Sequence, residues 1–194
     1  MLKLNLGCGY NRIDDYINVD LSAVCAPDLV ANLEETPWPW ATDSVESVVF
    51  NHSLEHMCAP ADRFLALMCE LYRVCCDGAI IQIAVPHPRH DNFIDDPTHV
   101  RIITPGVLRL FDRRKNDEWR QERIANTPLA DYLGVDFEIT SSQAMLDEPY
   151  RSDFRAGRLT AAEVESMVRD KLNVAQEYRI TLRVRKPTVA FAGK

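Results

Sequence analysis

The stretch Leu2-Lys3-Leu4-Asn5-Leu6-Gly7-Cys8-Gly9 decides the fold class. Apolar and polar residues alternate over residues 2–6, and this period of two predicts a β-strand. Gly7 and Gly9 follow at once, and glycine accepts the backbone angles of a tight turn and lets a ligand approach the main chain closely. The stretch therefore predicts a strand that enters a tight turn, although many strand-to-loop turns carry glycine without binding a ligand.

Further strands and helices alternate along the rest of the chain. Strands are expected at residues 16–20, 28–33, 45–50, 79–85, 136–142 and 178–185, and helices at residues 61–75 and from Thr160 to about Asn173. Thr104 and Thr127 each precede a proline, a pattern typical of a helix start. This alternation predicts a doubly wound α/β fold, in which a mostly parallel seven-stranded sheet has helices on both faces and an antiparallel edge strand. Residues 1–194 are expected to form a single domain.

Ligands of doubly wound sheets bind beyond the carboxyl ends of the parallel strands. This rule brings together residues that are far apart in the sequence, namely Gly7 to Gly9, Asp20, Asn32, Asn51-His52 and His87. Asp20 ends the second strand, where a carboxylate either accepts hydrogen bonds from ribose hydroxyls or forms a turn. The Gly-x-Gly turn and this acidic strand end together favour an adenosine-containing ligand.

Charge argues against nucleic acid as a general partner. The 194 residues include 22 Lys and Arg and 29 Asp and Glu, which gives a formal net charge of −7. Broad binding to DNA or RNA depends on Lys and Arg that neutralise phosphates. Residues 1–100 hold 5 basic and 15 acidic side chains, whereas residues 101–194 hold 17 and 14. This split has two interpretations: a cationic ligand near the first half and an anionic one near the second, or simply two differently solvated faces.

The apolar pattern predicts a cytoplasmic protein without membrane contact. The longest apolar run, around Ala79 to Val85, is interrupted by Gln82, so no membrane span is expected. The N-terminus has neither the apolar stretch nor the basic start of a signal peptide. The six cysteines lack paired, regular spacing, and we expect them to be reduced.

The combination of these segments resembles the class I S-adenosylmethionine-dependent methyltransferases. The resemblance rests on residues 4–9 (Leu-Asn-Leu-Gly-Cys-Gly), 17–21 (Ile-Asn-Val-Asp-Leu), 43–49 (Asp-Ser-Val-Glu-Ser-Val-Val) and 51–56 (Asn-His-Ser-Leu-Glu-His). It implies a Rossmann-like fold and methyl transfer from S-adenosylmethionine to an oxygen or nitrogen of a small molecule, sugar-like or anionic. The implied cofactor contacts are Leu6, Gly7, Cys8, Gly9, Asp20, Leu21, Asn32, Leu33, Asn51 and His52.

The resemblance also implies a place for each part of the cofactor. Gly7 to Gly9 would lie beneath the methionine part, and Asp20 would hold the ribose. Asn32 and Leu33 would flank the adenine. Asn51-His52 would lie near the methionine end or the substrate.

The first crossover departs from the common pattern of this family. Only nine residues, Gly7 to Asp15, separate the first two strands, and a parallel crossover usually needs about a dozen or more. We therefore expect the helix after the glycine turn to be shortened or missing, as in a short-crossover variant of the family. This departure leaves a second function open, a catalytically silent module that binds S-adenosylmethionine.

The segment His52-Ser53-Leu54-Glu55-His56 also fits H-x-x-E-H, the signature of inverted zinc peptidases. On an α-helix, His52 and His56 would share one face and could bind zinc, with Glu55 as the base. A buried strand directly before the segment and Pro60 shortly after it do not suit such a helix. A zinc-dependent hydrolase is therefore a remote alternative, and no metal ligand is predicted.

The polar loop over residues 86–101 is rich in His and Asp and belongs to an expected substrate-side insertion over residues 86–126. His87, His90 and His99 are the candidates for a general base, because histidine titrates near neutral pH. His87 comes first, since it directly follows the fifth predicted strand. The same loop could instead bind a divalent metal or form a polar surface turn. The expected partner is a small-molecule acceptor, and the oligomeric state is not predicted.

Overall fold

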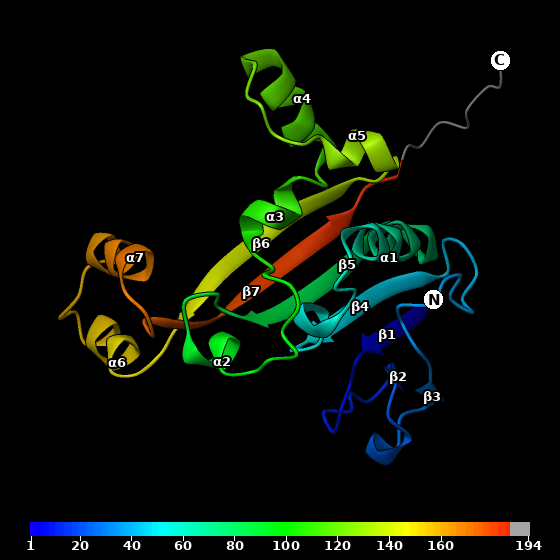
Figure 1. Cartoon of the computed structure of the whole chain (residues 1–194), viewed down its shortest axis with the longest axis horizontal. Coiled ribbons are helices and arrows are strands. Elements are labelled where there is room, and N and C mark those ends of the chain that lie inside the picture. Colours follow the sequence, from blue (N-terminus) through cyan, green and yellow to red (C-terminus); the bar gives the residue numbers. More distant parts are fainter. Residues whose placement is uncertain (187–194) are drawn as a thin grey trace.

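The computed structural model describes residues 1–186, whose strands form a seven-stranded sheet (Figure 1). The strands are β1 (Leu2–Leu6), β2 (Ile17–Asp20), β3 (Leu29–Val30), β4 (Val45–Asn51), β5 (Cys75–Pro86), β6 (Phe137–Leu146) and β7 (Ala175–Val184). Their order in the sheet is β3-β2-β1-β4-β5-β7-β6. The first five strands along the sheet, β3, β2, β1, β4 and β5, are parallel to one another. β7 pairs antiparallel with both β5 and the edge strand β6. The expected mostly parallel sheet with an antiparallel edge is confirmed.

Two of the three predicted helix caps, Thr104 and Thr160, are confirmed, whereas the helix after Thr127-Pro128 has no side-chain cap. The helices are α1 (Ala61–Val74), α2 (Asp91–Ile94), α3 (Pro105–Arg109), α4 (Arg113–Glu122), α5 (Leu129–Leu133), α6 (Tyr150–Arg155) and α7 (Ala161–Asp170), with two 3-10 turns, η1 (Ala23–Cys25) and η2 (Leu54–His56). Thr104 caps α3 by accepting a hydrogen bond from the Val107 N–H, and Thr160 forms a capping box with Glu163. No helix among residues 1–186 has the length and apolar content needed to cross a membrane.

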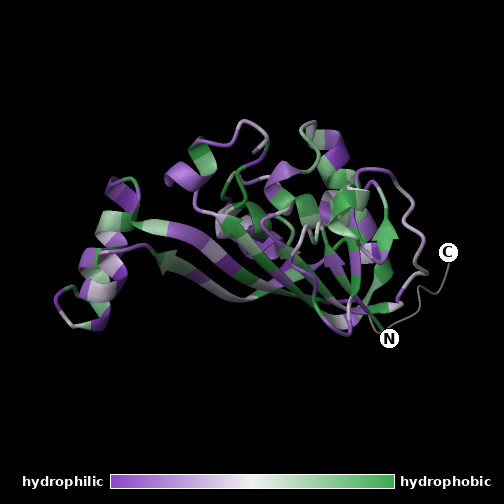
Figure 2. Ribbon diagram, turned by 90° about the horizontal axis from the view of Figure 1, so that it is seen from below, coloured by the Kyte–Doolittle hydropathy of each residue, from purple (hydrophilic) through white to green (hydrophobic). Residues whose placement is uncertain are grey.

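The two faces of the sheet are covered differently. In Figure 2 the helices between β4 and β6 lie on one side of the strands. Val48, Ile81 and Leu182, which are neighbours across β4, β5 and β7 and share one face of the sheet, are fully buried. On the other side Gln82, in the middle of β5, is exposed. The expectation of helices on both faces is wrong, because the β1–β2 and β2–β3 connections contain no α-helix. The expectation of a shortened or missing helix after the glycine turn is confirmed, since no helix lies between β1 and β2.

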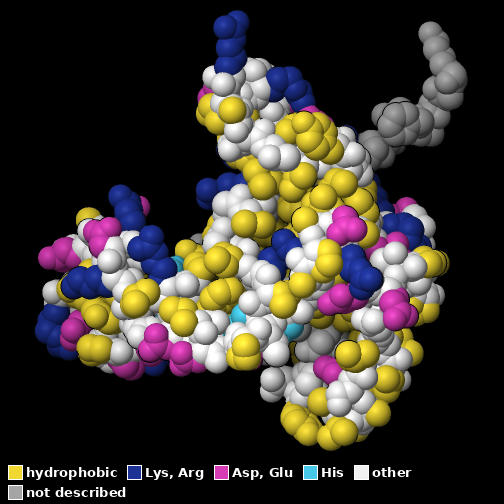
Figure 3. Space-filling model, viewed as in Figure 1, with side chains coloured by type: hydrophobic (Ala, Val, Ile, Leu, Met, Phe, Trp, Pro, Cys, Tyr) yellow, Lys and Arg dark blue, Asp and Glu magenta, His cyan; other side chains and the backbone are white. Residues whose placement is uncertain are grey.

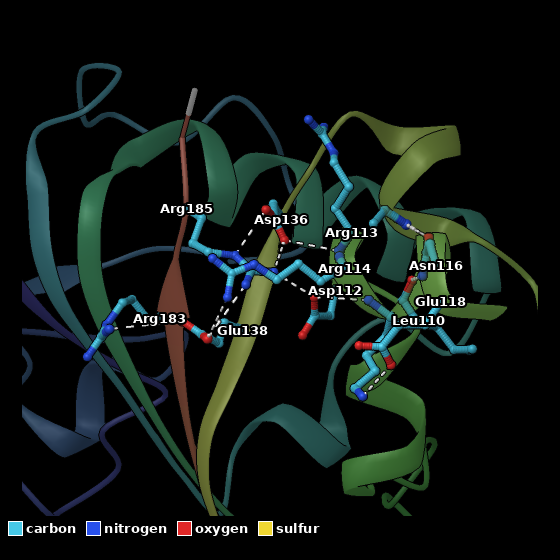
Figure 4. Close-up of polar contacts among 12 residues, drawn as sticks. Leu110, Asp112, Arg113, Arg114, Asn116, Glu118, Asp136, Glu138, Arg183 and Arg185 are labelled. Carbon is cyan, nitrogen blue, oxygen red and sulfur yellow. Dashed lines mark hydrogen bonds and ion pairs between the residues drawn. The ribbon is translucent and has the colours of Figure 1, made fainter. Parts of the chain in front are cut away.

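β6 and β7 form a long hairpin that extends beyond the parallel strands and has α6 and α7 at its far end (Figure 1). At the opposite end, Arg185 connects this hairpin to the body. Its guanidinium contacts the carboxylates of Asp112, at 2.5 Å, and Asp136, at 2.6 Å (Figure 4). Asp112 also caps α4 by accepting hydrogen bonds from backbone N–H groups. This ion cluster therefore fixes α4 against the end of β7.

Candidate functional site

A cleft of about 320 Å³ lies at the carboxyl ends of β1, β2, β3 and β4. The strand order reverses between β1 and β4, and this is the position at which open α/β sheets bind ligands. Its volume lies at the lower end of the range of small-molecule sites, about 300–1,000 Å³. The lining residues are Gly7, Gly9, Asp20, Leu21, Ala31, Asn32, Leu33, Glu34, His52, Ser53, His56 and Met57.

The glycine turn after β1 forms the floor of this cleft. Gly7 and Cys8 both donate their backbone N–H to the carbonyl oxygen of Val19, at 2.9 and 3.0 Å, which ties the turn to β2. Gly7 has a φ of +70°, and a Cβ atom at this position would lie 2.4 Å from the Cβ of Ser53. Glycine is therefore required here both for its backbone angle and for the close approach of the segment after β4.

Asp20 projects from the end of β2 beside this turn. Its Oδ2 accepts a hydrogen bond from the Gly9 N–H at 2.8 Å, and its Oδ1 accepts one from the Ser22 N–H at 2.8 Å. An ionised carboxylate has about four acceptor positions. Two such positions remain for a ligand in the cleft, which suits a pair of neighbouring hydroxyl groups.

The structure brings together seven of the ten residues predicted as cofactor contacts, namely Gly7, Gly9, Asp20, Leu21, Asn32, Leu33 and His52. Leu6 and Cys8 are buried beneath the turn, at 0% and 3% exposure. Asn51 lines a hollow on the open face of the sheet, together with Gln82 and Thr181. Side chains alternate along a strand, so Asn51 points away from the face that buries Phe50.

Sequence reasoning missed five lining residues, namely Ala31, Glu34, Ser53, His56 and Met57. Ser53 and His56 belong to the segment that carries the family resemblance, and this was the available signal. Ser53 donates its Oγ hydrogen to the Leu6 carbonyl oxygen at 2.7 Å, which holds η2 over the glycine turn. Nothing in the spacing predicts this contact between residues 47 positions apart.

His87, the first candidate base, does not line the cleft. It is 4% exposed, and its Nδ1 accepts a hydrogen bond from the Arg89 N–H at 3.2 Å. The proton is therefore on Nε2, which lies 3.0 Å from the Tyr178 hydroxyl. Burial, together with the positive charge of Arg89, lowers the pKa of His87. Both ring nitrogens are thus engaged within the protein.

His90 and His99, the other two candidates, also lie outside the cleft lining. His90 caps α2, since its Nδ1 accepts a hydrogen bond from the Asn92 N–H, and its Nε2 lies 3.1 Å from Asp147 Oδ2. His99 donates its Nδ1 hydrogen to the Phe93 carbonyl oxygen at 2.9 Å. Its ring lies against that of His56, with centroids 4.5 Å apart, and His56 lines the cleft.

His52, which was expected near the cofactor, lines the cleft with a side chain that is 43% exposed. Its Nε2 lies 2.8 Å from Glu177 Oε2 on β7. A carboxylate is acceptor-only, so Nε2 holds a proton and the lone pair of the neutral ring is on Nδ1. Figure 3 shows patches of histidine surface where the segment after β4 meets the segment around α2.

The H-x-x-E-H segment does not form the α-helix that a zinc peptidase of this signature requires. Residues 54–56 are a 3-10 turn, and His52 precedes it with a left-handed φ of 51°. His52 instead pairs with Glu177, as described above. Glu55 is 1% exposed, and burial raises the pKa of its carboxyl group. The arrangement expected of a zinc-dependent hydrolase, with His52 and His56 on one helix face, is therefore not formed.

No protein-family model and no curated protein matches the sequence. Solved structures do match. An S-adenosylmethionine-dependent methyltransferase from Archaeoglobus fulgidus aligns with a TM-score of 0.58 and 19% identity, over 94% of this chain and 86% of that chain. The 1,6-didemethyltoxoflavin-N1-methyltransferase of Burkholderia thailandensis was solved with bound 1,6-didemethyltoxoflavin and S-adenosylhomocysteine. It aligns with a TM-score of 0.51 and 12% identity, over 95% of this chain and 71% of that chain.

A third match carries a different activity in its name. The [4+2]-cyclase SpnF aligns with a TM-score of 0.52 and 16% identity, over 95% of this chain and 75% of that chain. One fold can host unrelated chemistry, and identities this low concern the fold alone. The chain has the Rossmann-like fold of the class I S-adenosylmethionine-dependent methyltransferases.

Proposed function

We propose that this protein transfers the methyl group of S-adenosylmethionine to an oxygen or nitrogen of a small, sugar-like or anionic molecule. The observation that carries the proposal is the hydrogen bond between the Gly9 N–H and Asp20, at the point where the strand order reverses. It brings the glycine turn and the acidic strand end to one cleft. The fold similarity to methyltransferases supports the same cofactor.

Each part of the cofactor has a chemically suited neighbour in the cleft. The free acceptor positions of Asp20 suit the ribose hydroxyls, and Asn32 and Leu33 suit the adenine. The main chain at Gly7 and Gly9 suits the methionine part, because no Cβ restricts its approach there. The carboxylates of Asp20 and Glu34 line the same cleft and favour a cationic sulfonium over its neutral product.

His52 replaces His87 as the proposed base. It lines the cleft, and Glu177 both orients its ring and stabilises the charge that forms when Nδ1 takes a proton. Methyl transfer needs the acceptor atom in line with the methyl carbon and the sulfur, at roughly 3–3.5 Å. Holding the two substrates in that geometry is the main task of the protein, and the base removes the acceptor's proton.

Residues 86–126 would form the acceptor side of the site, within a single domain over residues 1–194. Residues 101–194 carry the basic excess, which suits a neutral or anionic acceptor and not a nucleic acid. We propose a cytoplasmic setting, since all six cysteines are free in the structure.

Two measurements test this function. Calorimetry should detect binding of S-adenosylmethionine and S-adenosylhomocysteine at one site per chain. Methyl-labelled cofactor, incubated with a panel of sugar and carboxylate acceptors, should then give a labelled product whose formation falls in the His52→Gln variant. The His87→Gln variant serves as the matched control and should retain transfer. Absence of cofactor binding would contradict the proposal.

A catalytically silent S-adenosylmethionine-binding module is the second candidate. One observation favours it: the β1–β2 connection contains no α-helix, so this wall of the usual cleft is absent. Cofactor binding by calorimetry, without label transfer to any acceptor, would support the silent module.

A further inference from the structure

Three potential metal ligands meet beside the cleft. The ligand atoms of Glu55, His56 and His99 all lie within 4.8 Å of one another. Glu55 and His56 belong to η2, and the backbone carbonyl of Glu55 accepts hydrogen bonds from the N–H groups of Val100 and Arg101. These two bonds hold the segment that carries His99 against η2. The cluster is therefore built by contacts between segments about 43 residues apart in the chain.

Glu55 lacks the partners that a buried carboxylate needs. Its side chain is 1% exposed, and neither Oε1 nor Oε2 has a hydrogen-bond partner. Two histidine nitrogens lie near this carboxylate, His52 Nδ1 at 3.7 Å and His99 Nε2 at 4.0 Å from Oε1, and both are beyond hydrogen-bond distance. Buried carboxylates are normally paired, hydrogen-bonded or bound to a metal. These two oxygens therefore indicate a missing positive partner.

The hydrogen bonds of His99 leave one ring nitrogen ready to bind a cation. Nδ1 faces the carbonyl oxygen of Phe93 at 2.9 Å, and a carbonyl can only accept, so Nδ1 carries the proton. In the neutral ring the lone pair is then on Nε2, the atom that lies nearest Glu55 and also 3.8 Å from Asp96 Oδ2. A histidine held through its other nitrogen by a backbone carbonyl is a common arrangement around bound metals.

Hydrogen bonds also leave one ring nitrogen of His56 free to bind a cation. Its Nδ1 lies 2.9 Å from the Thr98 hydroxyl, and that hydroxyl donates its only hydrogen to Asp96 Oδ1 at 2.6 Å. Nδ1 must therefore be the donor to Thr98, and the lone pair of the neutral ring is on Nε2. Both histidines thus have their tautomer fixed by neighbours, Phe93 within α2 and Thr98 in the segment that follows it.

We propose that Glu55, His56 and His99 bind a divalent cation of the zinc type. Two imidazoles and one carboxylate suit such an ion, and three protein ligands leave a coordination position open. The cation would supply the positive charge that the two Glu55 oxygens lack. His56 also lines the cleft, so the ion would lie beside the site proposed for methyl transfer. The proposed metal site does not rest on methyl transfer, and its test is a Zn²⁺ titration without cofactor or acceptor.

The test is calorimetric titration of Zn²⁺ into tag-free, chelator-treated full-length protein. We expect one Zn²⁺ per chain, and a loss of affinity of about tenfold to a hundredfold or more in Glu55→Gln and in His99→Gln. His90→Gln is the matched control, because His90 is also a buried histidine beside a carboxylate, Asp147, outside the cluster. This control should bind Zn²⁺ as the wild type does.

Thermal melting separates loss of the site from loss of the fold. Without metal, Glu55→Gln should melt at or above the temperature of the wild type, since it removes a buried unpaired acid. Zn²⁺ should raise the melting temperature of the wild type and not that of this variant. Co²⁺ as a spectroscopic probe should show nitrogen and oxygen ligands. Absence of Zn²⁺ binding, unchanged affinity in both variants, or a cobalt–thiolate spectrum would overturn the proposal.

Discussion

The backbone N–H of Gly9 donates a hydrogen bond of 2.8 Å to Oδ2 of Asp20. Gly9 follows β1 and Asp20 ends β2, and only a short loop without a helix connects the two strands. This bond, with those of Gly7 and Cys8 to Val19, places the floor of the cleft directly beside its acidic edge. The short crossover therefore preserves the arrangement of turn and carboxylate without the usual helix.

Replacing Asp20 with alanine should weaken binding of S-adenosylhomocysteine. The change removes the acceptor of the proposed ribose hydrogen bonds, and a bond to a charged group contributes about 1.5–3 kcal/mol. We expect a tenfold to hundredfold higher dissociation constant by calorimetry. Asp14→Ala is the control, since Asp14 is an exposed acid that does not line the cleft. Equal affinities in the two variants would count against the ribose role of Asp20.

Gly7→Ala should destabilise the protein more than Gly78→Ala. Both glycines have left-handed φ angles, +70° and +78°, but an added Cβ meets Ser53 at 2.4 Å at Gly7 and nothing within 4 Å at Gly78. The backbone cost is about 1 kcal/mol in each variant, and overpacking adds about 1–3 kcal/mol at Gly7 alone. Urea denaturation of both variants measures the difference. Equal losses of unfolding free energy in the two variants would show that the Ser53 side chain does not restrict residue 7.

The buried pair of His87 and Tyr178 should make stability depend on pH. Burial and the nearby Arg89 and His90 lower the pKa of His87 below its unfolded value, about 6.5. The unfolded chain then binds more protons, so this contribution to stability is present above about pH 6.5 and decreases as the pH falls through that value. His87→Gln should remove this contribution. Urea denaturation at several pH values should show that the unfolding free energy of the variant falls less than that of the wild type between neutral and mildly acidic pH. Identical pH profiles of the two proteins would contradict a lowered pKa of His87.

Arg185→Ala should cost far more stability than Arg183→Ala. Arg185 is 16% exposed and contacts Asp112 and Asp136, so its loss leaves two largely buried carboxylates unpaired (Figure 4). Removing one partner of a buried ion pair costs about 3–5 kcal/mol. Arg183 is 52% exposed and lies 4.0 Å from Glu138, and such a surface pair contributes about 0–1 kcal/mol. Similar unfolding free energies for the two variants would contradict the role of this cluster.

The sequence predicts the sheet well because strand positions depend on local patterns. Alternation over residues 2–6 and the apolar runs near residues 45–50 and 79–85 correspond to β1, β4 and β5. β3 is shorter than predicted, Leu29–Val30 in place of residues 28–33. β3 is an edge strand that pairs with β2, so its length depends on where β2 ends. The local sequence of residues 28–33 holds no information about that position.

The site was predicted only in part, because its chemistry depends on long-range contacts. Gly7, Gly9 and Asp20 end predicted strands, so topology alone places them together. His87 also follows a strand, yet Tyr178 on β7 and the Arg89 N–H engage its ring. Likewise, the cluster of Glu55 with His99 arises from the folding of the segment after α2 back onto η2. Spacing along the chain carries no information about such contacts.

The most direct test of the central claim is an NMR titration of the uniformly ¹⁵N-labelled protein with S-adenosylhomocysteine. If the cleft at the ends of β1, β2 and β3 binds the cofactor, the amide signals of Gly7, Gly9, Asp20 and Leu33 will shift in a saturable manner. Signals from the open face of the sheet, such as those of Gln82 and Thr181, will stay unchanged. No shifts at saturating ligand, or shifts confined to the open face, would contradict the account.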